Sequence, residues 1–300
     1  MGSHSIGAEQ AHRHNVFDNS LEPVLRIAAG DSVRFECPPM PMPRNATPED
    51  LIANVSPVHP HTIVGPVYVE GARPGDVLVV DVLEIELGQD FGHTFIVPGL
   101  GLRTDRFPEP HVHNWDLSDG ESAELAPGVR VPLRPFLGIM GVAPAEPGEH
   151  STIPPRAAGG NIDIARLTAG STLYLPVEVE GALFSCGDGH AAQGHGEVCG
   201  TGIETALNAT LRFQLDGGRK LEQPAFRTPD AYVTTAVGPD LHDCAGRAID
   251  QMVDHLVAER GLTPEQAYVL CSTAVDLAIE EIVDMPNWVV SATLRLALFR

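Results

Sequence analysis

The sequence predicts a β-rich α+β fold with a β-sandwich-like core, long loops, and a C-terminal pair of helices followed by a strand. The 300-residue chain contains 30 Gly and 26 Pro, which favour many short strands joined by turns. Apolar and polar residues alternate over 205–214, whereas helical spacing is confined to the region after residue 240. With 43% hydrophobic and 20% charged residues, the chain can bury a full core.

Strands are expected between residues 24 and about 216. The segment 77–85 is aliphatic and β-branched, and 205–214 has the alternation of a half-buried strand. Both are predicted to be long antiparallel strands. The stretch 98–155 is rich in Pro, Gly and Arg, so we expect loops or very short strands there that pack over the sheet.

Two helices are predicted near the C-terminal end. Asp243 can cap the first, whose apolar residues follow helical spacing as far as Gly261. Residues 263–266 have the form of a capping box with Pro at the first helical position, and the second helix should run to about Glu281. The segment 290–298 alternates again and should return to a sheet.

Length, charge and cysteine content limit the organisation and the partners. We expect a single domain over 12–300, β-rich over 12–240 and helical with a strand over 241–300. A formal net charge of −21 repels phosphate backbones and anionic headgroups, which argues against nucleic-acid and membrane partners. Five cysteines without C-x-x-C spacing, and no signal peptide or membrane-length apolar run, favour a cytoplasmic protein. A homo-oligomer is the expected assembly.

The densest polar cluster spans residues 186–197 and follows an apolar strand. Five glycines between 187 and 200 allow sharp bends there. Asp188 and His190 lie on the same side of an extended segment, and both side chains suit a divalent ion, with zinc expected first and calcium second. Asp-x-His alone also fits a solvated glycine-rich loop. A functional site becomes the better interpretation because further polar residues follow closely: Gln193, His195 and Glu197.

The segment 187–197 resembles a motif of a known family. Its sequence, Gly-Asp-Gly-His-Ala-Ala-Gln-Gly-His-Gly-Glu, is similar to the G-D-x-H-x-x-Q-G-D-G-E motif of the bacterial acetamidase/formamidase family. Blocks at 65–76, 159–163 and 275–277 agree with the family in the same order, so the resemblance covers residue 12 to the end. The chain departs from the motif at His195, where the family usually has Asp.

The resemblance implies hydrolysis of a small amide substrate, such as formamide or acetamide, to the carboxylate and ammonia, with a divalent metal. A metal suits this reaction because it lowers the pKa of bound water and polarises the carbonyl. Asp188 and His190 are the expected ligands. Glu197 can be a general base or a further ligand. Gln193 suits the amide or the oxyanion.

Other candidates rest on weaker patterns. Asn161 and Asp163 follow two glycines, and the resemblance places them in the same pocket, as a substrate-binding and a catalytic residue. An Asx turn explains that segment equally well. His59, held extended by the following Pro60, is a further candidate ligand, as is His195; His61 ranks below His59 because nothing constrains it.

Several rival functions are weighed against this one. The only lysine, Lys220, lies in a polar turn, which counts against Ser-Ser-Lys and Glu-Lys-Cys amidases. No G-x-S-x-G nucleophile elbow is present. A non-hydrolytic, cupin-like binding domain that uses His59 and His61 stays open, as does a metal hydrolase of larger or cyclic amides.

Overall fold

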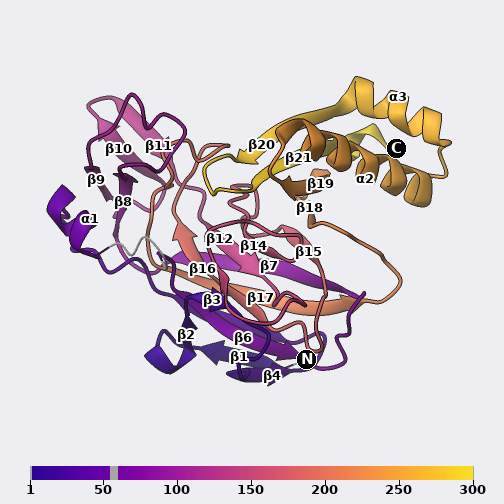
Figure 1. Ribbon diagram of the computed structural model, residues 1–300, viewed down its shortest axis with the longest axis horizontal. Coiled ribbons are helices and arrows are strands. Elements are labelled where there is room, and N and C mark those ends of the chain that lie inside the picture. The colour runs from indigo at the N-terminus through magenta and orange to yellow at the C-terminus, as the bar shows by residue number, and fades with distance from the viewer. Residues whose placement is uncertain (1, 55–59, 300) are drawn as a thin grey trace.

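Two large β-sheets form the centre of the molecule (Figure 1). The computed structural model describes residues 2–54 and 60–299. The larger sheet has nine strands in the order β1-β5-β17-β7-β15-β18-β19-β21-β20, all antiparallel to their neighbours except β1, which is parallel to β5. In chain order these are β1 (Ser3–Ile6), β5 (Ser32–Cys37), β7 (Val77–Leu87), β15 (Thr172–Pro176), β17 (Leu207–Asp216), β18 (Ala225–Arg227), β19 (Ala231–Gly238), β20 (Val275–Glu281) and β21 (Trp288–Arg295).

The second sheet has six strands in the order β14-β12-β16-β6-β2, with β4 also paired to β6. Three further two-stranded ribbons are present among the described residues: β8 with β9, β10 with β11, and β3 with β13. The second sheet contains β2 (Arg13–His14), β4 (Leu25–Ile27), β6 (Ile63–Val69), β12 (Phe136–Gly141), β14 (Gly159–Asn161) and β16 (Phe184–His190). The ribbons contain β3 (Val16–Phe17), β8 (Phe91–Ile96), β9 (His111–Asp116), β10 (Ser122–Ala126), β11 (Val129–Pro132) and β13 (His150–Ser151).

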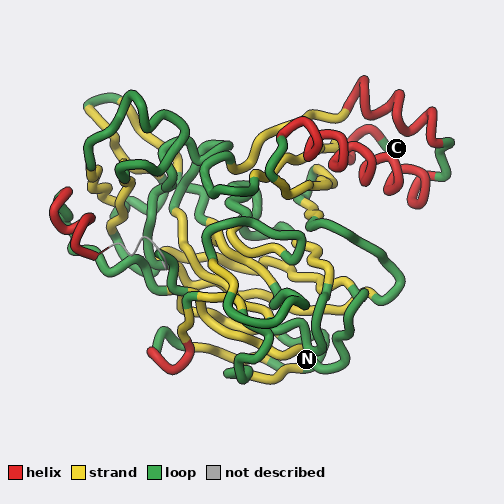
Figure 2. Tube along the Cα trace, in the orientation of Figure 1, coloured by secondary structure: helices red, strands yellow, loops and turns green. Residues whose placement is uncertain are grey.

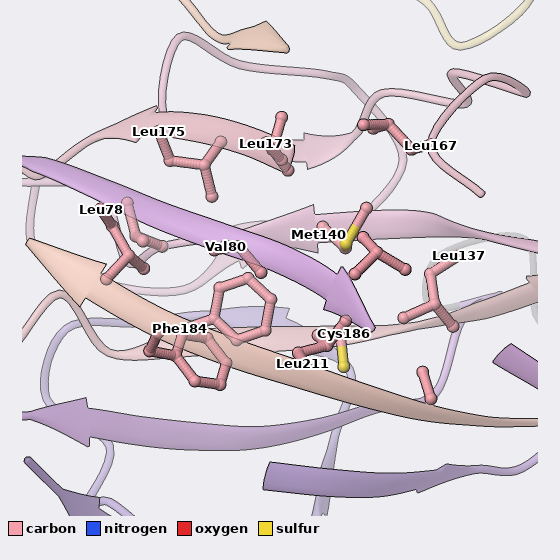
Figure 3. Close-up of a cluster of buried hydrophobic side chains, with 14 of the residues drawn as sticks. Leu78, Val80, Leu137, Met140, Leu167, Leu173, Leu175, Phe184, Cys186 and Leu211 are labelled. Atoms are coloured by element: carbon pink, nitrogen blue, oxygen red, sulfur yellow. The ribbon is translucent and has the colours of Figure 1, made fainter. Parts of the chain in front are cut away.

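The main hydrophobic core lies between the two sheets. Phe35 on β5, Phe184 on β16 and Phe213 on β17 are fully buried, with ring centroids 5.0–6.2 Å apart in edge-to-face contact. Figure 3 shows aliphatic side chains of both sheets, such as Leu78 and Met140, packed around them. Burial of each such ring stabilises the fold by about 2–3 kcal/mol. The predicted β-rich α+β fold with a sandwich-like core is therefore confirmed.

The two long strands are confirmed as β7 and β17, which pair antiparallel along most of their lengths. The stretch 98–155 contains short strands, as expected. One of them, β12, is buried at every residue and forms an inner strand of the second sheet rather than a covering loop.

The two long helices lie together at one end of the molecule, and the short α1 (Pro48–Asn54) lies apart from them (Figure 2). The first C-terminal helix, α2 (Leu241–Arg260), ends at Gly261 in the left-handed conformation, and the capping box of α3 (Pro264–Ala274) is formed by Thr263 and Gln266, both as predicted. None of the described helices is long and apolar enough to cross a membrane.

Two predicted helix limits are wrong. The N-cap of α2 is Asp240, whose side chain accepts a hydrogen bond from the backbone N–H of Asp243. The second helix stops at Ala274 instead of Glu281, and the residues that follow form the edge strand β20. β-branched Val275 and Ile279 suit a strand, and pairing with β21 satisfies backbone groups that a helix would otherwise bond internally.

Candidate active site

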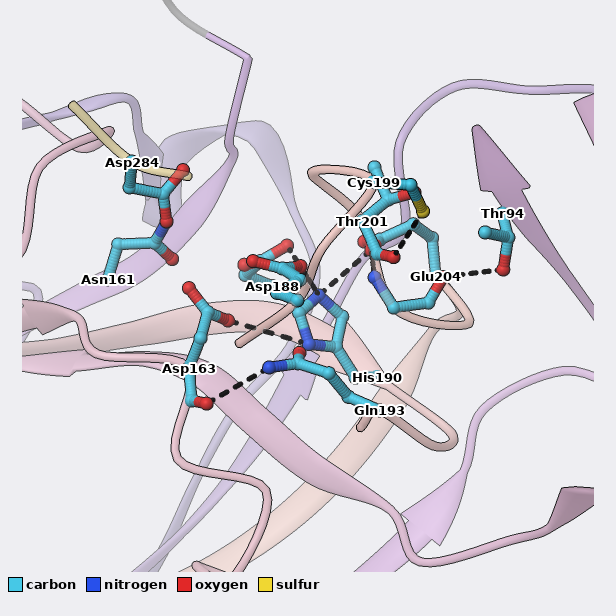
Figure 4. Close-up of polar contacts among 12 residues, drawn as sticks. Thr94, Asn161, Asp163, Asp188, His190, Gln193, Cys199, Thr201, Glu204 and Asp284 are labelled. Atoms are coloured by element: carbon cyan, nitrogen blue, oxygen red, sulfur yellow. Dashed lines mark hydrogen bonds and ion pairs between the residues drawn. The ribbon is translucent and has the colours of Figure 1, made fainter. Parts of the chain in front are cut away.

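A buried cluster of carboxylates surrounds His190 at the end of β16 (Figure 4). Nε2 of His190 lies 2.9 Å from Oε1 of Glu204, 3.6 Å from Oδ1 of Asp188 and 3.9 Å from Oε1 of Glu197. On the other side of the ring, Nδ1 lies 3.5 Å from Oδ1 of Asp163. All five side chains are at most 9% exposed. The sequence candidates Asp163, Asp188, His190 and Glu197 therefore converge on one site.

The backbone is strained at three of these carboxylates. Asp163, Asp188 and Glu197 have φ values of 43°, 57° and 46°, in the left-handed region that residues other than Gly seldom adopt, Glu even less often than Asp. Such conformations cost about 1–3 kcal/mol each and persist where the surrounding structure enforces them. The fold therefore holds these side chains inward against local preference.

Gly138 on β12 provides the space in which two carboxylates meet. A Cβ atom at this position would lie 2.5 Å from Oδ1 of Asp163 and 2.6 Å from Oδ2 of Asp188. Its carbonyl oxygen also accepts hydrogen bonds from the backbone N–H groups of Ile162 and Asp163. A side chain at position 138 would therefore displace both carboxylates.

Burial and the ion pairs around His190 act in opposite directions on the pKa values of the cluster. Burial raises the pKa of Asp163 and of Glu197 well above their ordinary values, and raises that of Glu204. For Asp188 burial is outweighed by the nearby His190, so its pKa is lowered. For His190 burial is likewise outweighed, and Glu204 and Asp188 raise its pKa well above the ordinary value. The cluster holds more carboxylates than cations.

A second buried group adjoins Asp163. Asn161 on β14 donates from Nδ2 to Oδ2 of Asp284 at 2.6 Å, and Asp284 follows the edge strand β20. Burial raises the pKa of Asp284 well above its ordinary value and that of Glu281 to about 7. Oδ1 of Asn161 and both carboxylate oxygens of Asp163 are buried without a hydrogen-bond partner in the described chain. The C-terminal strands therefore contribute directly to the site.

The donor set fits a divalent cation. Two groups of three side chains bring ligand atoms within 4.8 Å of one another: Asp163, His190 and Glu197, and Asp188, His190 and Glu204. Ligand atoms that each lie about 2.1 Å from one tetrahedral zinc ion are about 3.4 Å apart. The 3.6 Å between Nε2 of His190 and Oδ1 of Asp188 is close to this separation, whereas Oε1 of Glu204 lies nearer, at 2.9 Å from Nε2. Asp163 faces the other ring nitrogen, and both of its carboxylate oxygens are buried without a hydrogen-bond partner among the described residues.

His61 also belongs to this neighbourhood. With Asp188 and Glu204 it lines a small cavity of about 10 Å³, room for one small species. Its Nδ1 lies 3.1 Å from Oγ1 of Thr152, and burial lowers its pKa, which favours the neutral imidazole that binds metals. His59, the ligand candidate ranked above it, lies outside the described residues.

Gln193 and His195 occupy the approach to the cluster. Gln193 donates from Nε2 to the carbonyl oxygen of Asp163 at 3.0 Å, while its Oε1 has no partner among the described residues. His195 is placed elsewhere than the ligand prediction expects: its Nδ1 lies 2.8 Å from Oε2 of Glu280, and neither group of close ligand atoms includes it.

A cavity of about 600 Å³ borders the cluster at Glu197. Gln193, His195 and Glu197 line it, together with Trp115 and Arg134 from the ribbon side. A larger cavity of about 960 Å³ lies between α2 and the segment 218–223. Its lining includes none of the residues around His190, so the smaller cavity is the better substrate site.

Sequence reasoning missed three members of the site. Glu204 lies beyond the recognised motif, and an isolated acidic residue just before the apolar strand β17 is the signal that could have found it. His61 was named only behind His59, because spacing alone does not show which loop histidine turns inward, and the structure places it beside Asp188 and Glu204. Asp284 was hidden by the helix predicted over its neighbours.

The chain matches known proteins over nearly its full length. The sequence model of the Acetamidase/Formamidase family matches residues 3–151 and 145–300. A formamidase from Methylophilus methylotrophus is 29% identical over an alignment of 353 residues, which covers 91% of this chain and 86% of that protein. A crystal structure of an acetamidase from Bacillus halodurans is 30% identical, with a TM-score of 0.90 and 98% of both chains covered. A γ-lactamase structure from Delftia acidovorans is 25% identical, with a TM-score of 0.68, and 96% of this chain and 89% of that one are covered. The chain therefore belongs to the acetamidase/formamidase family of amidohydrolases.

Proposed function

We propose that this protein hydrolyses short aliphatic amides, formamide and acetamide first, with a divalent metal ion at His190. The observation that supports this most is the convergence of four buried carboxylates on one imidazole, next to a cavity that one of them, Glu197, lines, in a chain of this family. Buried charges without a cation are costly, so such a cluster indicates function.

We assign the metal to Asp188, Glu204 and Nε2 of His190, with His61 as the nearest further imidazole. Zinc is the expected ion because imidazole takes part, and calcium is the alternative. When bound, the ion supplies Lewis acidity for the amide carbonyl and for water. Asp163 faces Nδ1 of His190 and orients the ring, as carboxylates beside ligating histidines do.

The remaining residues bind the amide and move protons. Glu197 lies at the cavity wall and beside His190, where its carboxylate can take a proton from the attacking water. Oε1 of Gln193 is free to accept an N–H of the substrate amide, because its Nε2 is held by Asp163. Asn161 donates to Asp284, so we give it a supporting role beside Asp163.

Hydrolysis of larger or cyclic amides is the second candidate. The 600 Å³ cavity is far larger than acetamide, and the γ-lactamase shares the fold. Ring opening of a lactam leaves the nitrogen in the product, so it yields a new amine and no ammonia. The cytoplasmic location and the homo-oligomeric assembly stay predictions from composition.

Ammonia release by the purified protein from formamide, acetamide and butyramide tests the proposal, with 2-pyrrolidinone assayed by amine formation. We expect turnover of the short linear amides, loss of turnover after dialysis against a chelator, and recovery on addition of zinc. Elemental analysis of the untreated protein identifies the ion. Failure to release ammonia from any linear amide, with any added divalent metal, would overturn the substrate assignment.

A further inference from the structure

His195 is fixed in place by a fully buried carboxylate. Its Nδ1 lies 2.8 Å from Oε2 of Glu280, whose side chain is 0% exposed. Glu280 also accepts hydrogen bonds from Arg166 and from Oγ of Ser291 on the neighbouring strand β21. Because Arg166 and Ser291 hold the carboxylate, the carboxylate in turn fixes the plane and the tautomer of the imidazole.

The loop that carries His195 is attached to β20 through its backbone as well. The N–H of Gly196 donates to the carbonyl oxygen of Glu280 at 2.7 Å, and Gly196 pairs with Glu281 in a parallel bridge. A surface histidine in a glycine-rich loop would normally be free to rotate. Here the contact with Glu280 directs Nδ1 of the ring toward β20.

The other ring nitrogen is therefore the one available to a ligand. The His195 side chain is 49% exposed and lines the 600 Å³ cavity together with Gln193 and Glu197. With Nδ1 bound to Glu280, Nε2 is left for a molecule in that cavity. A histidine whose Nδ1 is held by a carboxylate and whose Nε2 meets the substrate is a common arrangement for proton transfer.

We propose that His195 is a catalytic residue that protonates the leaving nitrogen during amide hydrolysis. This inference rests on the proposed function. After Glu197 has taken a proton from the attacking water, a tetrahedral carbon carries both the oxygens and the amide nitrogen. As the C–N bond breaks, its electron pair moves to nitrogen, which takes the proton from Nε2 of His195 and leaves as ammonia. The proton held by Glu197 then returns to Nε2 through water, so the net reaction consumes one water molecule per amide.

The charges around His195 suit a proton donor. The hydrogen bond from Glu280 and its negative charge raise the pKa of His195, while partial burial and the charge of Arg166 oppose this rise. Two further charged side chains, Glu197 and Arg134, line the same cavity as His195. The contact with Glu280 thus favours the protonated form of the ring, the form that can donate to an amide nitrogen.

The pH dependence of kcat/KM for acetamide, measured on the metal-containing protein, tests the inference. His195→Gln should lower kcat/KM about 100-fold and remove the decline on the alkaline side that reports loss of the His195 proton. His111→Gln, on an exposed strand residue, is the control and should leave both unchanged. Metal content and thermal unfolding should match those of the unmodified protein in both variants.

Glu280→Gln provides the second test, should His195→Gln fail to fold. Without the carboxylate the His195 pKa falls, so the alkaline decline should move to lower pH while the enzyme retains partial activity. A His195→Gln protein that keeps at least a third of kcat/KM with an unchanged pH profile would overturn the inference, as would a Glu280→Gln profile with an unmoved alkaline side. If the unmodified protein releases no ammonia from amides, the proposed function itself fails and this role with it.

Discussion

Oδ1 of Asp163 faces Nδ1 of His190 at 3.5 Å, and neither atom has a hydrogen-bond partner in the described part of the chain. This relationship predicts that Asp163 acts through His190. Asp163→Asn keeps the shape but removes the charge, so metal affinity should fall about 10- to 100-fold. Because burial already opposes the ionised form of Asp163, the metal-free variant should be no less stable than the unmodified protein at pH 7. Competition with a fluorescent chelator gives the affinity, and urea unfolding of the metal-free proteins gives the stability. Equal metal affinities would contradict this role.

Gly138 should tolerate no side chain. Gly138→Ala places a Cβ against the carboxylates of Asp163 and Asp188, which must separate, so bound metal and amidase activity should both be lost. The strain should lower the free energy of unfolding by about 1–3 kcal/mol.

The matched control is Gly246→Ala on α2, where a Cβ would meet nothing within 4 Å. That change should keep activity and raise the free energy of unfolding by about 0.5–1 kcal/mol. Urea unfolding and elemental analysis of the two variants make the comparison. A Gly138→Ala protein with full metal content would show that the carboxylates are not held as described.

Glu204 should contribute as much to metal affinity as the ligands within the motif at 187–197. Glu204→Gln removes the negative charge 2.9 Å from Nε2 of His190 but can still accept the hydrogen bond from Gly202 N–H. We expect an unchanged fold and about 100-fold weaker metal binding. Glu265→Gln on the exposed first turn of α3 is the control. Isothermal titration calorimetry with zinc measures the metal affinity of both variants. An undiminished affinity in Glu204→Gln would show that Glu204 is not a ligand.

His255 on α2 should make the fold sensitive to acid. Its ring stacks on Tyr232 with centroids 3.7 Å apart, and burial lowers its pKa to about 4. Between pH 6.5 and pH 4 the unfolded chain binds a proton that the folded chain does not, so stability falls as the pH is lowered through this window. The contribution is on the order of 2 kcal/mol for this partly exposed group.

His255→Phe keeps the stacked ring and has no proton to bind. The difference in unfolding free energy between this variant and the unmodified protein should therefore grow in favour of the variant as the pH falls from 7 to 4.5. Carboxylates elsewhere contribute equally to both proteins and cancel in the difference. Parallel urea titrations at several pH values measure it, and a difference that does not change with pH would show that His255 is not desolvated.

The sequence was sufficient where a local pattern determines structure. The alternation over 205–214 predicted β17 because one face of that strand is buried, and the capping box at Thr263 fixed the start of α3. The predicted end of the second helix at Glu281 was wrong because 275–281 contains good helix formers. Only the pairing with β21 makes this segment a strand.

Of the candidate site, the sequence indicated mainly the polar cluster at 186–197. Asp188 and His190 share one strand, so their spacing indicated a common direction. Glu204, His61 and Asp284 reach the same place from three other segments, and which side chains converge there depends on how the sheets pack. His195 shows the converse, since a residue inside the motif turns away toward Glu280.

The position of β20 in its sheet gives this strand a further significance. Among the described strands β20 pairs only with β21, at the edge of the nine-stranded sheet, yet Glu280 and Glu281 belong to it and Asp284 follows it closely. Local opening at a sheet edge costs less free energy than unfolding of the whole domain. Mild heating can therefore displace these acidic side chains while the apolar core between the sheets stays packed, so inactivation would precede global unfolding.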